Sequence, residues 1–437
     1  MIQKAEITRR NFALAAGAFL ALPALRLRAE DSDNSVSAAE NAYIWGFPIV
    51  LTNRYRALAA DYPVNQFTLS TRLSSPEDKV AGPNVDTLYG FGFLDVSKEP
   101  LILHVPDTAD RYYSIHLIDA YQNSFAYVGR RATGTREGEY AITAPGWAGQ
   151  LPAGVTQVES PTAHLLALTR TLVRGEKDLA AAQAVQLQYT LRPLSAHQTT
   201  PAPPRTTAAA FNVFPFVDLS SAGGKVFEEL NAGVRLDPPS THERAPFNKF
   251  AAVGGSPAVL DQAASQANQR IAGADFSTDV NGWKVNYGIT NFIEDPLLRA
   301  SVSRIGPGAH VAQEALYFGA RVDREGQPLT GEHRYRIRFP EGGLPPVDAF
   351  WSLILYGPDF ALVSNPINRY SISDRTHALV KNSDGSLEVR IQPDAPENGT
   401  SNWLPSPRGR FSLVLRTYQP RAELFNGKYR VPALERL

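Results

Sequence analysis

Thr87-Leu-Tyr-Gly-Phe-Gly-Phe-Leu-Asp95 reads as a β-strand, and it opens the strand-rich part of the chain. The segment is short, aromatic and aliphatic, and turn-forming residues bound it on both sides, which is typical of a strand. Further segments of the same kind follow as far as residue 173, so we expect a strand-dominated domain here. These segments are Leu101–Val105, Tyr112–Ile118, Ser124–Val128 and Ala163–Val173.

The last third of the chain returns to the same pattern. Turn signals such as Asp323-Arg-Glu-Gly326 and Ser383-Asp-Gly385 separate its segments. Strands at such spacing with long connections suggest a sandwich or jelly roll, in which alternate residues are buried between two sheets. No short-period repeat indicates a solenoid or propeller. The expected strands are Leu316–Val322, Arg334–Phe339, Ala349–Leu355, Leu387–Ile391 and Arg410–Tyr418.

Helices are expected before and between the two strand-rich regions. The capping box Ser37-Ala-Ala-Glu40 predicts a helix over residues 37–60. Another is expected over residues 176–190, and Ser256-Pro257 is well placed as cap and first turn of a helix through residue 270. A last one is expected around residues 296–304.

The proline-rich stretch Thr199-Thr-Pro-Ala-Pro-Pro-Arg-Thr206 marks a domain boundary, because it cannot pair as a central strand and reads as a linker. We therefore expect a mainly β fold with helices: two antiparallel jelly-roll-like β-sandwich domains plus a helical connecting region. The divisions are a signal peptide at 1–29, an N-terminal jelly-roll-like domain at 37–198, a linker and helical connecting region at 199–310, and a C-terminal jelly-roll domain at 311–437.

The N-terminus has the features of a twin-arginine export signal. Thr8-Arg-Arg-Asn-Phe-Ala-Leu14 places paired arginines before an apolar segment that ends near Leu25, and a short exit follows to Ala29. The apolar run is shorter than the roughly 20 residues that a membrane-spanning helix needs. The alternative is a buried N-terminal helix after a chance arginine pair, but the acid-poor leader is followed at once by Glu30-Asp-Ser-Asp33.

This signal predicts a periplasmic or secreted protein that the twin-arginine translocation machinery exports already folded. Export of this kind suits proteins that hold a cofactor or must assemble first, and the sequence identifies neither. We therefore leave the cofactor unknown and a homo-oligomer open.

Composition excludes several classes of protein. The 437 residues, 43% of them hydrophobic, suffice for one large or two ordinary domains. The absence of cysteine excludes disulfides, iron–sulfur clusters and thiolate zinc sites. The 43 basic and 43 acidic residues are balanced, and loss of residues 1–29 would leave a net charge of about −4. With no run of Lys or Arg, we expect no nucleic-acid partner, and no membrane binding once the signal is removed.

Two groups of short motifs stand in order along the chain. The first is Pro83-Asn-Val-Asp-Thr-Leu-Tyr89, Asp95, Arg111-Tyr-Tyr113, Asp119-Ala-Tyr-Gln-Asn123, Gly129-Arg130 and Thr133-Gly134. The second is Asn281-Gly-Trp283, Ala349-Phe-Trp-Ser352, Asn365-Pro-Ile-Asn-Arg-Tyr370, Asp384-Gly-Ser386, Asn402-Trp-Leu-Pro-Ser-Pro407 and Arg416-Thr-Tyr418. The first group resembles the bacterial domain of unknown function numbered twelve-fifty-four, and the second resembles its usual companion, numbered twelve-fourteen. The resemblance implies two mainly antiparallel, jelly-roll-like domains plus helices, and it brings no established activity or cofactor.

Asn84 and Asp86 are candidate site residues because they precede the strand that opens at Thr87. In an extended segment both side chains would face the same way and present an amide beside a carboxylate, a pair that suits a sugar hydroxyl or a cation. Thr87 and Tyr89 would face the other way, and we count them among the substrate-binding candidates. The alternative is an Asx turn after Pro83, in which the polar side chains accept local backbone N–H groups.

A second candidate set shares odd parity along the segment from 111 to 123. An unbroken strand would gather a guanidinium, a carboxylate, an amide and two phenols on one side, which could hold a polar ligand. An internal Arg–Asp pair with tyrosine hydroxyls in a buried network is the alternative, and a turn between Asp119 and Asn123 would break the parity. The set is Arg111, Tyr113, Asp119, Tyr121 and Asn123, to which we add Arg130.

Metal, nucleotide and nucleophile motifs give no positive signal. The histidines have no ligand spacing, so we assign no metal site. His104 and His116 lie on consecutive expected strands and could meet Asp119 or Asp86 in a composite site, but satisfied strand histidines are the default. The chain has no Walker loop, no dinucleotide fingerprint and no G-x-S-x-G elbow.

The best functional prediction is an exported enzyme, a hydrolase or lyase, that acts on a polar, carbohydrate-like or other small substrate in the first domain. Its catalytic candidates are Asp86, Asp119 and His116, and the remaining residues above would bind substrate. Two alternatives stay open: a noncatalytic periplasmic ligand-binding protein that uses the same pocket, and a jelly-roll protein with an assembly or surface-interaction role.

Overall fold

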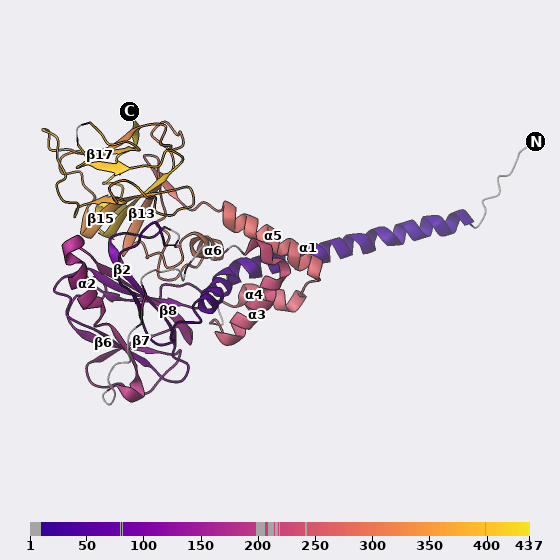
Figure 1. The fold of residues 1–437 in the computed structure, drawn as a ribbon. Coiled ribbons are helices and arrows are strands. Elements are labelled where there is room, and N and C mark those ends of the chain that lie inside the picture. The colour runs from indigo at the N-terminus through magenta and orange to yellow at the C-terminus, as the bar shows by residue number, and fades with distance from the viewer. Residues whose placement is uncertain are drawn as a thin grey trace, which may run out of the picture.

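A computed structural model gives the fold of the chain. It describes residues 10–437 except 79, 81, 198–205, 209–213, 215, 216, 218, 241, 242 and 398, and it leaves undescribed the side chains of 10–33, 176, 220 and 221. Arg9 and nearly all of the expected linker therefore lie outside the described residues. Figure 1 shows two strand-rich bodies with a group of helices beside them.

The N-terminal domain is a sandwich of a six-stranded and a four-stranded sheet. The strand order is β10-β1-β2-β8-β4-β5 in the first and β7-β6-β3-β9 in the second. Pairing is antiparallel except between β1 and β10 and between β6 and β7. The bounds are β1 Thr68–Ser70, β2 Thr87–Asp95, β3 Leu101–Val105, β4 Tyr113–Asp119, β5 Ala126–Gly129, β6 Gly138–Thr143, β7 Val155–Glu159, β8 His164–Leu172, β9 Thr190–Pro193 and β10 Thr206–Ala208.

Alternation along the strands builds the core of this sandwich. Even-numbered residues of β2 and odd-numbered residues of β4 and β8 face the four-stranded sheet, as Leu94, Ile115 and Leu165 do in one buried cluster. The residues between them face away from that sheet. The predicted strands in this region are confirmed, β2 and β3 with the predicted bounds.

Helices cover part of the outward face of the six-stranded sheet. Phe91, Phe93 and Leu168 of the sheet pack in one cluster with α1 and with helices from the connecting region. Ser256 caps α5 by accepting a hydrogen bond from the Val259 amide at 3.4 Å, as predicted. The bounds are α1 Arg10–Leu58, α2 Leu179–Gln186, α3 Val226–Leu236, α4 Ala245–Val253, α5 Pro257–Gly273 and α6 Pro296–Ile305.

The predicted start of the first helix at Ser37 is wrong. Helix α1 begins at Arg10 and crosses both the expected cleavage point at Ala29 and the capping box without a break. The Ala- and Leu-rich leader has high helix propensity, so no cap is needed at Ser37. Figure 1 shows the early part of α1 projecting from the body of the molecule. No helix in the described part of the chain is long and apolar enough to cross a membrane.

The C-terminal domain is a second sandwich, again of six and four strands. The orders are β11-β12-β13-β19-β15-β16 and β18-β17-β14-β20. Edge strands β11 and β12 lie inside the range expected for the helical connection, so this domain takes in more of the chain than 311–437. The bounds are β11 Thr278–Val280, β12 Trp283–Val285, β13 Ala315–Ala320, β14 Tyr335–Phe339, β15 Val347–Tyr356, β16 Ser371–Ser373, β17 Leu387–Gln392, β18 Trp403–Pro405, β19 Ser412–Pro420 and β20 Glu435–Arg436.

Candidate functional site

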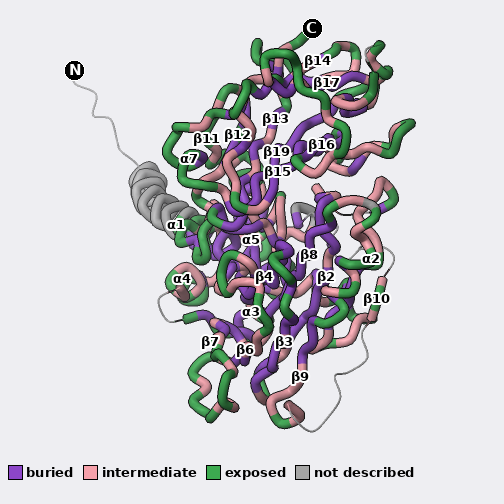
Figure 2. Tube along the Cα trace, turned by 90° about the vertical axis from the view of Figure 1, so that its left-hand side faces the viewer, coloured by how far each residue is buried: buried purple, intermediate pink, exposed green. Residues whose placement is uncertain are grey.

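The outward faces of the two six-stranded sheets meet between the domains. Tyr112 and Leu172 from the first domain pack in one buried cluster with Phe350 and Tyr418 from the second. Figure 1 places β13 and β15 directly beside β2, and Figure 2 shows β2, β4 and β8 as largely buried. An outward sheet face is often solvated, so a buried one rich in polar side chains needs an explanation.

Each sheet presents an arginine at its centre, flanked across the strands by a tyrosine and a serine. In the N-terminal sheet Arg170 of β8 pairs with Tyr89 of β2 and Ser114 of β4. In the C-terminal sheet Arg416 of β19 pairs with Tyr317 of β13 and Ser352 of β15. The two domains thus contribute the same three residue types in the same arrangement.

Both arginines are buried, being 7% and 6% exposed. Nη2 of Arg170 donates to the Gly308 carbonyl at 2.8 Å, and its guanidinium lies 5.4 Å from the Tyr89 ring. Nη2 of Arg416 donates to the Gly82 carbonyl at 2.6 Å, and Nη1 bonds the Tyr356 hydroxyl. Among the described residues, no carboxylate lies within 4.0 Å of either guanidinium.

Two buried histidines lie beside Arg170. The ring of His116 stacks on Tyr127 with centroids 4.4 Å apart, and the ring of His310 is 5.4 Å from that of His116. Burial lowers the pKa of both rings well below the usual value, and the charge of Arg170 lowers it further. Both imidazoles are therefore neutral at pH 7.

Three buried nitrogens in this cluster have no hydrogen-bond partner in the described structure: His116 Nδ1, Arg170 Nη1 and His310 Nε2. Native proteins rarely leave such groups unpaired, because each unmade bond costs about 1–3 kcal/mol. We call the set Tyr89, Ser114, His116, Tyr127, Arg170, His310, Tyr317, Arg416 and Tyr418 the interdomain polar site.

A buried carboxylate borders the interdomain polar site and is fully engaged. Glu314 accepts a hydrogen bond from the Tyr112 hydroxyl at 2.8 Å and pairs with Arg131. Because Glu314 is 1% exposed, this pair neutralises a charge that would otherwise be buried alone. Glu314 therefore does not compensate Arg170 or Arg416.

Of the predicted residues, Asn84, Asp86, Thr87 and Tyr89 do lie at the domain interface. Oδ1 of Asn84 accepts bonds from the amides of Asp86 and Thr87, both at 2.9 Å, which is the Asx turn offered as the alternative. Its Nδ2 reaches the hydroxyls of Tyr89 at 2.9 Å and Tyr418 at 3.1 Å. Asn84 thus positions the loop that leads to the interdomain polar site.

Asp86 joins the two domains. Its Oδ2 accepts a hydrogen bond from Ser352 at 2.6 Å, and its Oδ1 pairs with Arg375. The carboxylate is 3% exposed and its oxygens are committed to these partners. This arrangement favours a structural role for Asp86 over the predicted catalytic one.

The candidate residues at odd-numbered positions from 111 to 123, and Arg130, do not gather at one place. Arg111 pairs with Asp178 on the sandwich side, where Tyr113 stacks on Tyr189. Arg130 instead crosses to the second domain, where it donates to the Gln419 side chain at 2.5 Å. The buried Arg–Asp pair of the alternative therefore forms with Asp178, not Asp119.

Asp119 lies at the far end of the sheet. Asp119 pairs with Leu165 at one end of β8, whereas the residue after Asp86 pairs with Leu172 at the other end. The two carboxylates are therefore separated by roughly 20 Å along the strands. The chain turns after Asp119, which accepts the amides of Tyr121 at 2.9 Å and Asn123 at 2.8 Å. Burial raises the pKa of Asp119 to about 6. Asp86 and Asp119 thus cannot act in one site.

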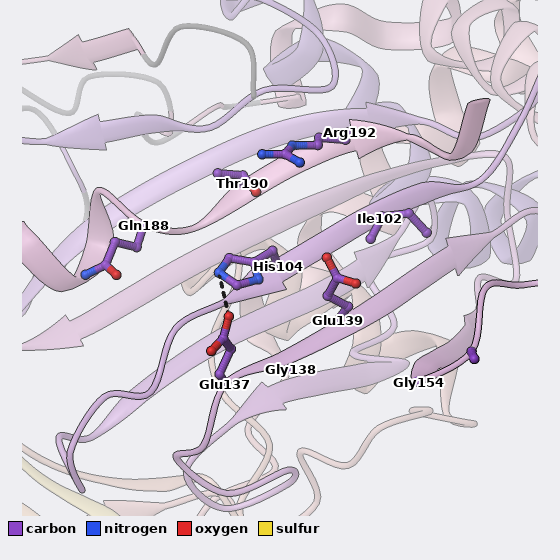
Figure 3. A pocket seen from close by; sticks show the side chains of 10 residues that line it. Ile102, His104, Glu137, Gly138, Glu139, Gly154, Gln188, Thr190 and Arg192 are labelled. Atoms are coloured by element: carbon purple, nitrogen blue, oxygen red, sulfur yellow. Dashed lines mark ion pairs between the residues drawn. The ribbon is translucent and has the colours of Figure 1, made fainter. Parts of the chain in front are cut away.

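The composite metal site weighed from the sequence does not form. His104 and His116 lie on different sheets and face outward on opposite sides of the sandwich core. Within the described residues, no three His, Cys, Asp or Glu side chains come together as metal ligands. His104 instead borders an open depression of about 700 Å³ on β3, β6 and β9, where it lies 3.8 Å from Glu137 (Figure 3).

The sequence reasoning missed Arg170, Arg416, His310 and Tyr317. A signal was present, because each arginine stands at an outward position with apolar or hydroxylated residues on both sides of it in the strand. That pattern does not tell a solvated face from a face against another domain, so the arginines did not stand out.

One solved structure has the same fold as this chain. The chain has a TM-score of 0.71 and 23% identity to the crystal structure of the VPA0106 protein from Vibrio parahaemolyticus, with 92% of this chain and 100% of that one covered. An uncharacterised protein from Burkholderia cenocepacia gives a TM-score of 0.46 and 13% identity over 94% and 96% of the chains. No curated protein matches. Family models described as proteins of unknown function match residues 64–193 (DUF1254) and 314–422 (DUF1214), and the chain belongs to this paired-domain family.

Proposed function

We propose that this chain is an exported periplasmic protein that binds a small polar molecule in the interdomain polar site. The unpaired nitrogens of His116, Arg170 and His310 carry the proposal, because they are the polar groups that a ligand would satisfy. Tyr89 and Tyr317 remain partly exposed, so accessible surface persists beside the arginines. Tyrosine rings and hydroxyls suit a carbohydrate-like or other hydroxylated compound.

We further propose that the protein acts on this molecule as a hydrolase or lyase. With the ring proton on Nε2 and donated to Ser124, His116 would accept a proton from the ligand at its unpaired Nδ1. Tyr127 keeps its proton at neutral pH, because burial raises its pKa, and its hydroxyl orients His310. The arginines would stabilise negative charge that develops in the transition state.

Noncatalytic binding is the second candidate. It is favoured by one observation: two carboxylates at the interface, Asp86 and Glu314, are committed to ion pairs, so neither is free to act as an acid in catalysis.

A ligand-capture experiment tests these proposals. The full chain is purified without denaturation from the periplasm, and bound small molecules are identified by native mass spectrometry. A polar ligand that is bound 1:1 and then converted by wild type, but held unchanged by His116→Gln, supports the enzyme. A ligand recovered unchanged from both supports the binder. If no ligand is captured and a library of polar metabolites gives no binding, the proposed function is wrong.

The export proposal has a separate test. Replacement of both Arg9 and Arg10 by lysine should keep the protein in the cytoplasm, because paired arginines are the feature that the export machinery recognises. Cell fractionation with an epitope-tagged chain measures this. Equal periplasmic amounts of variant and wild type would contradict the twin-arginine route.

A further inference from the structure

We infer that the interdomain polar site binds an oxyanion, a carboxylate or phosphate group of a small molecule, between Arg170 and Arg416. This inference rests on the proposed function and names the class of its ligand. Three features of the site support it: uncompensated charge, unpaired donors and matched presentation of the arginines by the two domains.

Arg170 and Arg416 carry positive charge that has no carboxylate partner. Arginine is always protonated in proteins, so the two guanidiniums bring two positive charges into a site that is largely removed from water. Burial of an unpaired charge is costly, and buried arginines normally have a carboxylate partner. Arg111 and Arg299 follow that rule elsewhere in this chain, beside Asp178 and Glu243. Arg170 and Arg416 depart from it, and an anionic ligand would supply the missing charge.

Two unpaired nitrogens of the interdomain polar site are hydrogen-bond donors. The Tyr127 hydroxyl accepts the Val311 amide at 3.2 Å, so its own proton is free to point at His310 Nδ1, 3.4 Å away. In that arrangement neutral His310 carries its proton on Nε2. His310 Nε2 and Arg170 Nη1 are then both unpaired donors. The group missing beside His310 Nε2 and Arg170 Nη1 is therefore an acceptor, as an oxyanion is.

The two six-stranded sheets present their central arginines with matched geometry. Each arginine occupies the middle strand of three and lies against the face of a tyrosine ring, Arg170 at 5.4 Å from Tyr89 and Arg416 at 5.7 Å from Tyr317. A backbone carbonyl fixes Nη2 of each guanidinium. Such fixed, planar donors are suited to the oxygens of carboxylate and phosphate.

Other charged groups around the site do not fill this role. Asp86 approaches from the Ser352 side but is held by Ser352 and Arg375. Glu314 is held by Tyr112 and Arg131.

Binding of simple anions by the full chain tests the inference. Inorganic phosphate, acetate and succinate are titrated at constant ionic strength by calorimetry, with glucose and glycerol as neutral compounds. At least one anion should bind, and Arg170→Met or Arg416→Met should weaken it by about tenfold to a hundredfold, the usual effect of a lost charged hydrogen bond. Arg408→Met removes an exposed arginine, 78% accessible, and should leave binding unchanged.

The controls keep each outcome decisive. Circular dichroism shows whether each variant folds. If Arg170→Met does not fold, Arg170→Lys, which keeps the positive charge, is used in its place. Lack of binding by all three anions would overturn the inference, as would binding that is unaffected in both arginine variants. Binding of glucose or glycerol alone would overturn the anion and leave the proposed function standing. Failure of the ligand-capture experiment, with anion binding intact, would remove the function and keep the anion site.

Discussion

The stability of this protein should depend on pH through Asp119. Its carboxyl group is 2% exposed, and burial raises its pKa to about 6 against the opposing effect of hydrogen bonds from Asn123. Arg299 of α6 also favours the charged form, and Glu243 opposes it. Because the folded-state pKa exceeds the unfolded value of about 3.9, the folded state prefers the protonated form.

Linkage between protonation and folding gives the sign and the size of the change in unfolding free energy. The stability that Asp119 contributes is fully present below about pH 4, is lost as the pH rises to about 6, and stays lost above it. A difference of about two pH units, at 1.36 kcal/mol each, corresponds to about 3 kcal/mol. The variant Asp119→Asn does not titrate and should lack this loss, whatever constant cost the substitution brings.

Urea unfolding of wild type and Asp119→Asn at pH 4 and pH 7 measures the effect. The stability advantage of wild type over the variant should fall by about 2 kcal/mol between the two pH values, because part of the loss has already occurred at pH 4. Asp275→Asn is the control of opposite sign, because hydrogen bonds from Ser277 lower the pKa of exposed Asp275 and make its contribution grow with pH. If the difference for Asp119→Asn stays constant or grows with pH, the reasoning is refuted.

Three further substitutions test the packing and the interface. Asp86→Ala should cost about 3–5 kcal/mol in urea unfolding, because it leaves Arg375 without its buried partner; a loss below 1 kcal/mol would contradict the structural role. Asp295→Ala should cost about 1 kcal/mol in the same assay by removing the N-cap of α6, and an unchanged midpoint would count against the cap. Gly46→Ala should lower stability by about 1–3 kcal/mol, since the new Cβ would lie 2.2 Å from Leu230; a stabilised variant would show looser packing of α1 on α3.

Much of the fold could be predicted from local pattern. Strands such as β2 and β3 are short apolar runs, buried at nearly every position, that end at turn residues, so their bounds follow from neighbouring residues alone. The start of α6 was also predictable, because Asp295 and Pro296 form a cap and first turn. Short edge strands such as β16 and β18 carry too few residues for a pattern, and their pairing is decided by distant parts of the chain.

The candidate site was only partly predictable, because strand pairing decides which residues meet. Asn84, Tyr89 and His116 were identified and do lie at the interface. Asp119 was grouped with them by sequence proximity, yet the length of β4 carries it to the other end of the sheet. The central residue Arg170 was missed, since only the packing of one domain on the other makes its face an interior.

A crystal structure of the full chain grown with inorganic phosphate tests the central claim most directly. We predict electron density for an oxyanion about 2.7–2.9 Å from Arg170 Nη1, with Arg416 on its other side. Guanidinium groups of Arg170 and Arg416 that are paired with protein carboxylates, with no room between them for an anion, would contradict the account.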